Sequence, residues 1–333
     1  MKRILSIILV LVLVTGAIIG CSKKADDGND KVAPVAESEQ QETREAVNAD
    51  QDESTSVWPR AYVDSRGNEI ILEKQPERIV VTTWMVTENL LALDMPPAAS
   101  DTVTMMSEWA SMKSYFEIYQ IDNLGESHVD VNIEKILDIQ PDLILATTAN
   151  EKIYDQLEKI APVIVFDTAT LFESWQGSIR EVAKVVGKEK TAEQFIEKTM
   201  DQLKTGREKI ATLEAGTFGF LRLINKGIYA FSEEQLSMYY DAAKGLDLSV
   251  PRGWPEKTGT ISLESFIEID PDYIFISGSE DQAMMEELEK NAAWNGLKAV
   301  KNGHLYPIDL SGLTGGPLAT KYGALTIVEA ISK

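Results

Sequence analysis

The most regular pattern of hydrophobic and polar positions along this chain occurs twice. Val131–Leu145 and Ile261–Phe275 match each other at an offset of 130 residues. In each copy, apolar residues first recur at helical spacing and then, after a Pro-Asp pair, form a continuous run. This pattern predicts a short helix that leads into a strand buried on both faces. The identical positions are Glu134 and Glu264, Ile139 and Ile269, Pro141 and Pro271, Asp142 and Asp272, and Ile144 and Ile274.

Local signals set the ends of both predicted helices. Asn132 in the first copy and Ser262 in the second can accept hydrogen bonds from free N–H groups of the first helical turn. The glutamate two residues later lies where the helix dipole favours negative charge. Pro141 and Pro271 stop the helices, because proline has no N–H and clashes in a helix interior. The chain therefore contains a duplicated helix–strand unit.

Further strand and helix patterns surround each copy. Arg78–Thr83 and Val163–Phe166 are predicted strands of the first half, and Thr217–Ile224 and Leu305–Ile308 of the second. Strands that alternate with helices are typical of α/β domains with mostly parallel sheets. We therefore predict an α/β protein with two Rossmann-like lobes.

A long helical pattern separates the two halves. Lys188–Glu214 contains no proline, one glycine, and apolar residues at roughly helical spacing. A helix of this length would span about 40 Å. A rigid helix between two similar lobes leaves a cleft, so we predict lobes at residues 58–187 and 215–333 with a ligand cleft between them.

The first 57 residues differ in composition from the rest. Residues 1–20 have the basic start and apolar centre of a secretory signal peptide, and Ala17–Cys21 resembles a bacterial lipobox. In that pattern Cys21, the only cysteine, becomes the lipid anchor; the alternative is a buried free thiol behind an ordinary signal peptide. Residues 22–57 contain ten acidic and four basic residues and no aromatic residue, Leu or Ile. We predict a disordered acidic tether over residues 21–57, with a binding tail as the alternative.

Charge and rare residues exclude several classes of function. The 333-residue chain has 53 acidic and 32 basic residues and a net charge of −21. Such a chain repels a phosphate backbone, so nucleic-acid binding is not expected. One cysteine and two histidines exclude disulfide frameworks, cysteine clusters and all-histidine metal sites.

Several segments, in order, resemble the substrate-binding proteins of ABC importers for iron-siderophores, haem and cobalamin. The matching segments are Glu77–Val81, Glu88–Leu93, the two Glu…Pro-Asp units, Tyr239–Asp241 with Gly245–Leu246, and Trp294 through Lys301–Tyr306. The resemblance implies two lobes joined by one long helix and a ligand between them. It also implies that Glu134 and Glu264 dock onto arginines of the permease. The alternative is that both are only first-turn helix acids.

Ligand contacts are expected at the carboxyl ends of the strands, as in open α/β sheets generally. Arg222 lies inside an apolar strand, which is costly unless the guanidinium meets an anion or a polar cleft. Its alternative role is a salt bridge to a nearby carboxylate, and an aromatic candidate can equally be a core residue. The predicted ligand residues are Thr83, Trp84, Trp109, Thr147, Arg222, Tyr239 and Trp254.

These features together predict an extracytoplasmic, lipid-anchored monomer that delivers a ferric siderophore to an ABC permease and its ATPase. Hydroxamate chelates are favoured over catecholates, because only one basic residue can be placed in the cleft. The iron arrives already chelated, so no cofactor and no metal ligands are expected. Haem and cobalamin are the alternatives within the same fold. A hydrolase is the alternative of another class, but the chain has no Gly-x-Ser-x-Gly motif.

Overall fold

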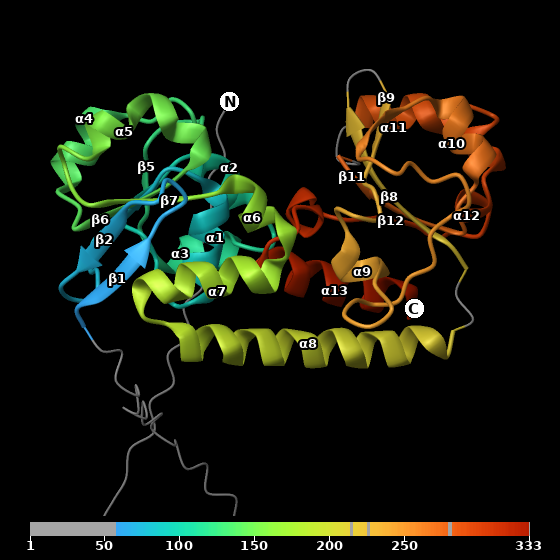
Figure 1. Ribbon diagram of the computed structural model, residues 1–333. Helices are drawn as coiled ribbons and strands as arrows, with labels where there is room; N and C mark the ends of the chain where they lie inside the picture. The colour runs from blue at the N-terminus through green and yellow to red at the C-terminus, as the bar shows by residue number, and fades with distance from the viewer. Residues whose placement is uncertain (1–57, 214–215, 225–226, 279–281, 333) are drawn as a thin grey trace, which may run out of the picture. The chain divides into compact units, whose positions relative to one another are not determined.

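Two five-stranded sheets form the framework of the chain (Figure 1). The computed structural model describes residues 58–213, 216–224, 227–278 and 282–332. The predicted leader, Cys21 and the predicted tether lie outside these residues. Within the described ranges, none of the helices combines the length and the apolar composition that a membrane span requires.

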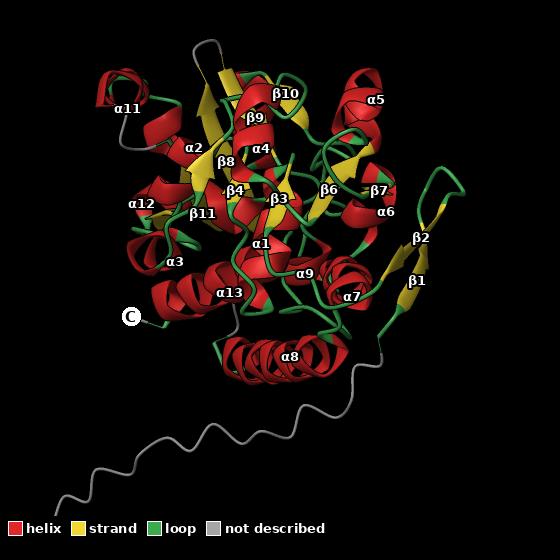
Figure 2. Cartoon of the chain, turned by 90° about the vertical axis from the view of Figure 1, so that its left-hand side faces the viewer, coloured by secondary structure: helices red, strands yellow, loops and turns green. Residues whose placement is uncertain are grey.

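The first sheet comes from the N-terminal half, and its strand pairs are all parallel. In spatial order its strands are β5 (Asp122–Asn123), β4 (Ala99–Ser100), β3 (Ile79–Val81), β6 (Leu143–Thr147) and β7 (Val163–Phe166). An antiparallel hairpin, β1 (Arg60–Val63) and β2 (Glu69–Leu72), lies to one side of this sheet (Figure 2). The helices of this half are α1 (Trp84–Ala92), α2 (Val103–Glu108), α3 (Lys113–Ile118), α4 (Ile133–Ile139), η1 (Thr148–Ile153), α5 (Tyr154–Leu157), α6 (Thr168–Glu173) and α7 (Trp175–Val186).

The second sheet comes from the C-terminal half and is mixed. In spatial order its strands are β10 (Gly259–Ile261), β9 (Gly227–Ala230), β8 (Phe218–Ile224), β11 (Tyr273–Ser277) and β12 (Leu305–Pro307). Strands β8, β11 and β12 pair in parallel, whereas β8–β9 and β9–β10 are antiparallel. The predicted α/β class is confirmed, but this sheet is less parallel than expected. Only two residues separate β8 from β9, which is too short for a parallel crossover.

The helices of the second half complete this lobe and close the chain. They are α9 (Ser237–Tyr240), α10 (Leu263–Ile269), α11 (Gln282–Glu289), η2 (Trp294–Gly296), α12 (Lys298–Lys301), η3 (Leu310–Leu313) and α13 (Pro317–Ile331).

The long helix α8 (Glu189–Ala211) lies between the two halves in sequence and has 23 residues, or about 35 Å. It packs against α7 and α13, below both of them in Figures 1 and 2. One hydrophobic cluster continues from the first sheet through α1, α7, α8 and α13 to the second sheet. Representative buried members are Val81, Leu90, Val182, Leu203, Ile327 and Phe220. The two sheets are therefore connected through a shared core as well as through the chain.

The duplicated unit has the same local structure in both halves. The Asn132 side chain accepts from the Lys135 N–H at the start of α4, and Ser262 accepts from the Ser265 N–H at the start of α10. The aspartate after each proline fixes the adjacent strand. Asp142 accepts from the Glu77 and Arg78 N–H groups ahead of β3, and Asp272 accepts from the Thr217 N–H and hydroxyl ahead of β8. Each copy therefore terminates a helix and aligns two neighbouring strands.

Candidate ligand-binding site

The predicted ligand residues of the first lobe gather at the carboxyl edge of its sheet. Thr83 and Trp84 follow β3, and Thr147 ends the neighbouring strand β6. Trp84 is partly buried and meets the buried Trp109 edge to face, with ring centroids 5.2 Å apart. The structure therefore brings Thr83, Trp84, Trp109 and Thr147 to one edge of the sheet.

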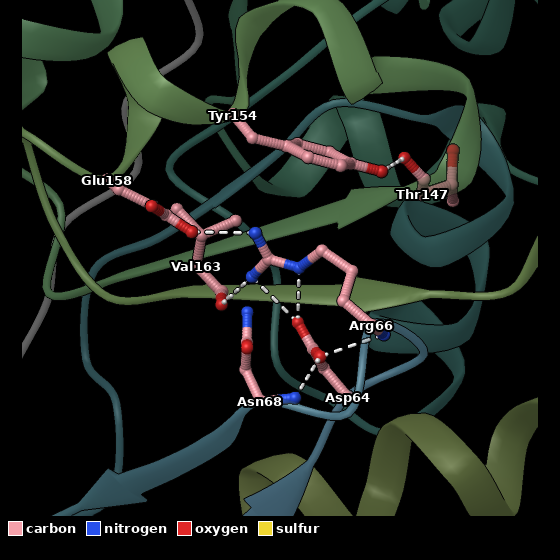
Figure 3. Close-up of polar contacts among 7 residues, drawn as sticks. All are labelled: Asp64, Arg66, Asn68, Thr147, Tyr154, Glu158 and Val163. Atoms are coloured by element: carbon pink, nitrogen blue, oxygen red, sulfur yellow. Dashed lines mark hydrogen bonds and ion pairs between the residues drawn. The ribbon is translucent and has the colours of Figure 1, made fainter.

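Burial separates Trp84, which is partly exposed, from the other three residues, which are buried. Thr83 and Thr147 are each only 1% exposed. The Thr147 carbonyl accepts a hydrogen bond from the Tyr154 hydroxyl at 2.8 Å (Figure 3). The Thr147 side chain also forms a capping box with Asn150. Thr147 therefore forms part of the buried scaffold of this edge, and its predicted ligand contact stays a prediction.

A polar network fixes this scaffold to the β1–β2 turn (Figure 3). Asp64 is buried and accepts from the Arg66 guanidinium at 2.7 Å and from two backbone N–H groups. Arg66 also donates to Glu158 at 2.6 Å and lies over the Tyr154 ring. Arg66 therefore links the β1–β2 turn to α5 and its C-cap residue Glu158. Tyr154 of α5 in turn donates its hydroxyl to the Thr147 carbonyl at the end of β6.

Asp101 is a residue of this edge that the sequence analysis missed. It follows β4 directly and is fully buried; one oxygen accepts from the Ser100 hydroxyl, and Oδ2 has no hydrogen-bond partner among the described residues. Burial raises the pKa of Asp101 to about 7. The signal in the sequence was the polar Ser100–Thr102 run after a short apolar stretch. A two-residue strand is too short to produce a recognisable pattern.

The second lobe presents Arg222 on one face of its sheet. Side chains along β8 alternate between faces, so Phe218, Phe220 and Arg222 point the same way. The two phenylalanines belong to the core shared with the first lobe, whereas Arg222 is exposed. Arg222 makes no ion pair with any residue that the structure describes. Among these residues, the alternative of a salt bridge is not observed.

Two tyrosines share this sheet face with Arg222, one on the adjacent strand and one two strands away. Tyr229 is the cross-strand partner of Arg222 on β9, and Tyr306 pairs with Phe275 on β12. Both tyrosines are partly buried. Tyr306 was not predicted as a ligand residue, because its position beside Phe275 depends on the pairing of β11 with β12. The face therefore combines one cation with phenol groups.

The structure places Tyr239 and Trp254 in buried positions, and their predicted ligand contacts stay predictions. Tyr239 is fully buried beneath Phe220, and its hydroxyl donates to the Gly312 carbonyl at 2.5 Å. Trp254 packs with Leu221 and Leu223 in a separate core cluster, and its ring N–H donates to the Phe231 carbonyl. Because Leu221 and Leu223 alternate with Arg222 along β8, Trp254 lies on the opposite face of the sheet from Arg222.

Hydrogen bonds from backbone N–H groups to side chains connect the Trp109 segment to the second half of the chain. The Ala110 N–H donates to Asp309 at 3.1 Å, and the Ser111 N–H donates to the Ser311 hydroxyl at 3.2 Å.

A separate pocket of about 460 Å³ lies between the lobes beside α8, with Phe172, Trp175, Met200 and Met238 among its lining residues. None of the predicted ligand residues lines this pocket.

The predicted docking residues occupy equivalent positions. Glu134 and Glu264 are both exposed and are the second residues of α4 and α10. Among the described residues, neither glutamate forms a salt bridge. The same part of the chain contains no group of three or more His, Cys, Asp or Glu side chains that could hold a metal ion.

Comparisons with known proteins agree with this architecture. A family model of periplasmic binding proteins matches residues 79–310. The chain is 29% identical over 252 residues to the putative ABC transporter substrate-binding lipoprotein YhfQ of Bacillus subtilis (strain 168), covering 71% of this chain and 77% of YhfQ. It is 30% identical over 226 residues to the iron(3+)-hydroxamate-binding protein FhuD of the same strain, covering 64% of this chain and 69% of FhuD.

A solved structure has the same fold. The triscatecholate siderophore binding protein FeuA from Bacillus subtilis, complexed with ferri-bacillibactin, superposes with a TM-score of 0.65 and 23% identity, covering 82% of this chain and 98% of FeuA. The resemblance inferred from the sequence is confirmed by these matches. The chain belongs to the periplasmic binding protein family.

Proposed function

We propose that this protein is the substrate-binding lipoprotein of an ABC importer and captures a ferric siderophore between its two lobes. The observation that carries the proposal is the exposed Arg222 on the sheet face that continues into the core shared with the first lobe. Relatives named as an ABC transporter substrate-binding lipoprotein and as an iron(3+)-hydroxamate-binding protein support the same class of cargo.

The chemistry of the two faces suits a chelate whose surface is partly apolar. Trp84 and Trp109 offer aromatic area from the first lobe. Arg222 offers a guanidinium that pairs with carboxylate or hydroxamate oxygens, and Tyr229 and Tyr306 offer hydroxyl groups. Since iron arrives inside the chelate, these contacts recognise ligand oxygens and carbon, and the protein needs no metal ligands of its own. We propose this role for Arg222, Trp84 and Trp109, with Thr83 behind them.

Hydroxamate chelates are the favoured cargo within this proposal. Ferric catecholates are highly anionic and suit a site with several cations, whereas one arginine marks the face described above. The relatives do not decide the question, because FhuD is named for hydroxamates and FeuA for a triscatecholate. Haem and cobalamin remain alternatives of the same fold. A surface hydrolase has no support from any catalytic arrangement found in the sequence.

Delivery to the permease is proposed to use Glu134 and Glu264. Their exposure and their equal positions at the starts of α4 and α10 give each lobe one carboxylate for an arginine of the permease. The proposed anchor is a lipid on Cys21, with residues 21–57 as the tether and residues 58–187 and 215–333 as the lobes on either side of α8. The protein would act outside the cytoplasm at the cell membrane as a monomer.

Calorimetric titration with a panel of ligands tests the proposal. The panel contains a ferric trihydroxamate, a ferric triscatecholate, haem and cobalamin, and each ligand is recovered and weighed by mass spectrometry. We expect saturable one-to-one binding, tightest for the trihydroxamate, with every ligand recovered unchanged. Chemical conversion of a ligand would favour an enzyme, and binding of haem or cobalamin alone would replace the siderophore assignment.

A further inference from the structure

The last helix of the chain lacks a cap from its own segment. The N-cap residue of α13 is Gly316, which has no side chain, and Pro317 at the first helical position has no N–H. The next N–H groups of the first turn still need an acceptor, because a helix leaves its first four donors unpaired. A serine, threonine or aspartate normally supplies this acceptor from the preceding residue.

Glu88 supplies the missing cap from the other half of the chain. It is the fifth residue of α1, it is 1% exposed, and its Oε1 accepts from the Ala319 N–H at 2.8 Å. The two residues are 231 positions apart. Burial raises the pKa of Glu88 to about 7, while hydrogen bonds from the Ala319 and Leu318 N–H groups lower it. The carboxyl group is thus enclosed between the two halves of the molecule.

The Gly315–Gly316–Pro317 motif fits this arrangement. A Cβ atom on residue 316 would overlap the Glu88 carboxyl group, whereas the Gly316 backbone, at φ −81°, is one that any residue adopts. A side chain at residue 316 would therefore displace the Glu88 carboxyl group from its cap position, whereas the backbone conformation alone would accept other residues. The preceding Gly315 has φ +82°, a left-handed conformation that favours glycine by itself.

The cap lies close to the residues proposed to contact the ligand. Trp84 and Glu88 are four residues apart on α1, so they share one face of the helix. The segment just ahead of α13 holds Asp309 and Ser311, which accept from the N–H groups that follow Trp109. Both tryptophans are consequently attached to the C-terminal part of the chain within a few residues of the cap.

We propose that Glu88 is a positioning residue for ligand binding, which holds the tryptophan pair of the first lobe at a fixed distance from Arg222 by capping α13. This inference rests on the proposed function for its link to a ligand. Its structural part, an interlobe latch formed by Glu88 and Gly316, does not depend on the proposed function. The latch acts through the orientation of the lobes and touches no ligand.

A double-mutant cycle tests the latch directly. Glu88→Ala, Gly316→Ala and the combined variant are compared with wild type by urea denaturation and by titration with a ferric trihydroxamate. We expect each single change to weaken binding about tenfold, as expected for a lost helix cap that also misplaces the tryptophans. In the Glu88→Ala background the clash is absent, so Gly316→Ala should have almost no further effect. Glu88→Gln, which keeps an acceptor of the same size, should restore most of the affinity.

Distance measurements separate orientation from simple loss of stability. Spin labels on Asp155→Cys in α5 and Lys301→Cys in α12, with Cys21→Ser to remove the other thiol, report the separation of the lobes. We expect a narrow distance distribution in wild type and a broader one in Glu88→Ala and Gly316→Ala. Gly296→Ala is the matched control, because a Cβ atom there meets no neighbour within 4 Å.

The latch is overturned if Glu88→Ala leaves both the distance distribution and the affinity unchanged, or if Gly316→Ala costs as much in the Glu88→Ala background as alone. If wild type bound none of the chelate, the proposed function would fail. The distance and denaturation results would then still decide on the latch.

Discussion

The helix–strand unit of the first lobe and that of the second lobe agree up to the end of the strand and differ beyond it. Both have a polar cap, an exposed glutamate at the second helical position, and an aspartate that fixes the next strand. Past the strands, Thr147 enters a capping box with Asn150, whereas Ser277 lies beside Arg222 and is followed by Gly278 at φ +81°. The shared features serve the fold and the proposed docking, and the differing ends form the two unlike faces proposed for the ligand.

The largest effect should follow removal of the shared glutamates. The combined Glu134→Ala and Glu264→Ala changes should reduce uptake of the iron chelate by cells at least about 100-fold, since each carboxylate is proposed to meet an arginine of the permease. Ligand affinity measured on the purified protein should stay within about twofold. Asp138→Ala with Glu268→Ala, exposed acids further along the same helices, is the control. Normal uptake by the first double variant would remove the docking role from both lobes at once.

Substitution of Arg222 tests whether the sheet face of the second lobe contributes to ligand affinity. Arg222→Ala should weaken binding of a ferric trihydroxamate by about 10- to 100-fold, because a charge-assisted hydrogen bond contributes roughly 1.5–3 kcal/mol. Arg222→Lys should lose less. Arg252→Ala, a second exposed arginine of the same lobe, should behave like wild type in the same titration. Equal affinities for Arg222→Ala and wild type would take this face out of the site.

The two aspartates test whether the copies contribute equally to stability. Asp142→Ala and Asp272→Ala should each lower the free energy of unfolding by about 2 kcal/mol, since each carboxylate accepts from backbone N–H groups at the start of a neighbouring strand. Urea denaturation of both variants gives the comparison. A loss at only one position would show that the repeated sequence no longer has a repeated role.

A pH series on Asp272 sharpens the same comparison. Although burial raises the pKa of Asp272, hydrogen bonds from Thr217 and the charge of Lys298 give a net lowering. A lowered pKa contributes stability that is present above about pH 4 and is lost as the pH falls through the folded-state pKa. The stability difference between wild type and Asp272→Asn should therefore shrink on acidification. A difference that stays constant from pH 7 to pH 3 would contradict this assignment.

Stability of the wild type should also depend on the pKa of Glu88, with the opposite sign. Its pKa is raised to about 7 by burial, so wild type loses stability as the pH rises from about 4.5 to about 7. The expected slope is about 1 kcal/mol per pH unit relative to Glu88→Gln. The nearby titratable groups, Tyr115 and Tyr239, stay neutral in this range because their pKa values are raised. If the stability curves of wild type and Glu88→Gln ran parallel across this pH range, Glu88 would be ionised in the folded protein throughout the range, which would contradict the assignment.

The sequence predicted the framework better than the site for a physical reason. Helix caps, proline stops and apolar runs are local, so the two units and α8 could be recognised within short windows. Contacts across strands are not local, which is why the strand neighbours of Tyr306 and the sheet face of Trp254 could not be predicted from the sequence. The burial of Tyr239 could not be predicted from the sequence for the same reason. Its hydroxyl is satisfied inside the protein by the Gly312 carbonyl, which is 73 residues away.

The position of the ligand between the lobes is tested most directly by a structure of the protein with a bound ferric trihydroxamate. Our account predicts a chelate that contacts Trp84 on one side and Arg222 on the other, with no protein atom bonded to iron. A chelate seated in the pocket beside α8, against Phe172 and Met238, or bound to a single lobe, would contradict it.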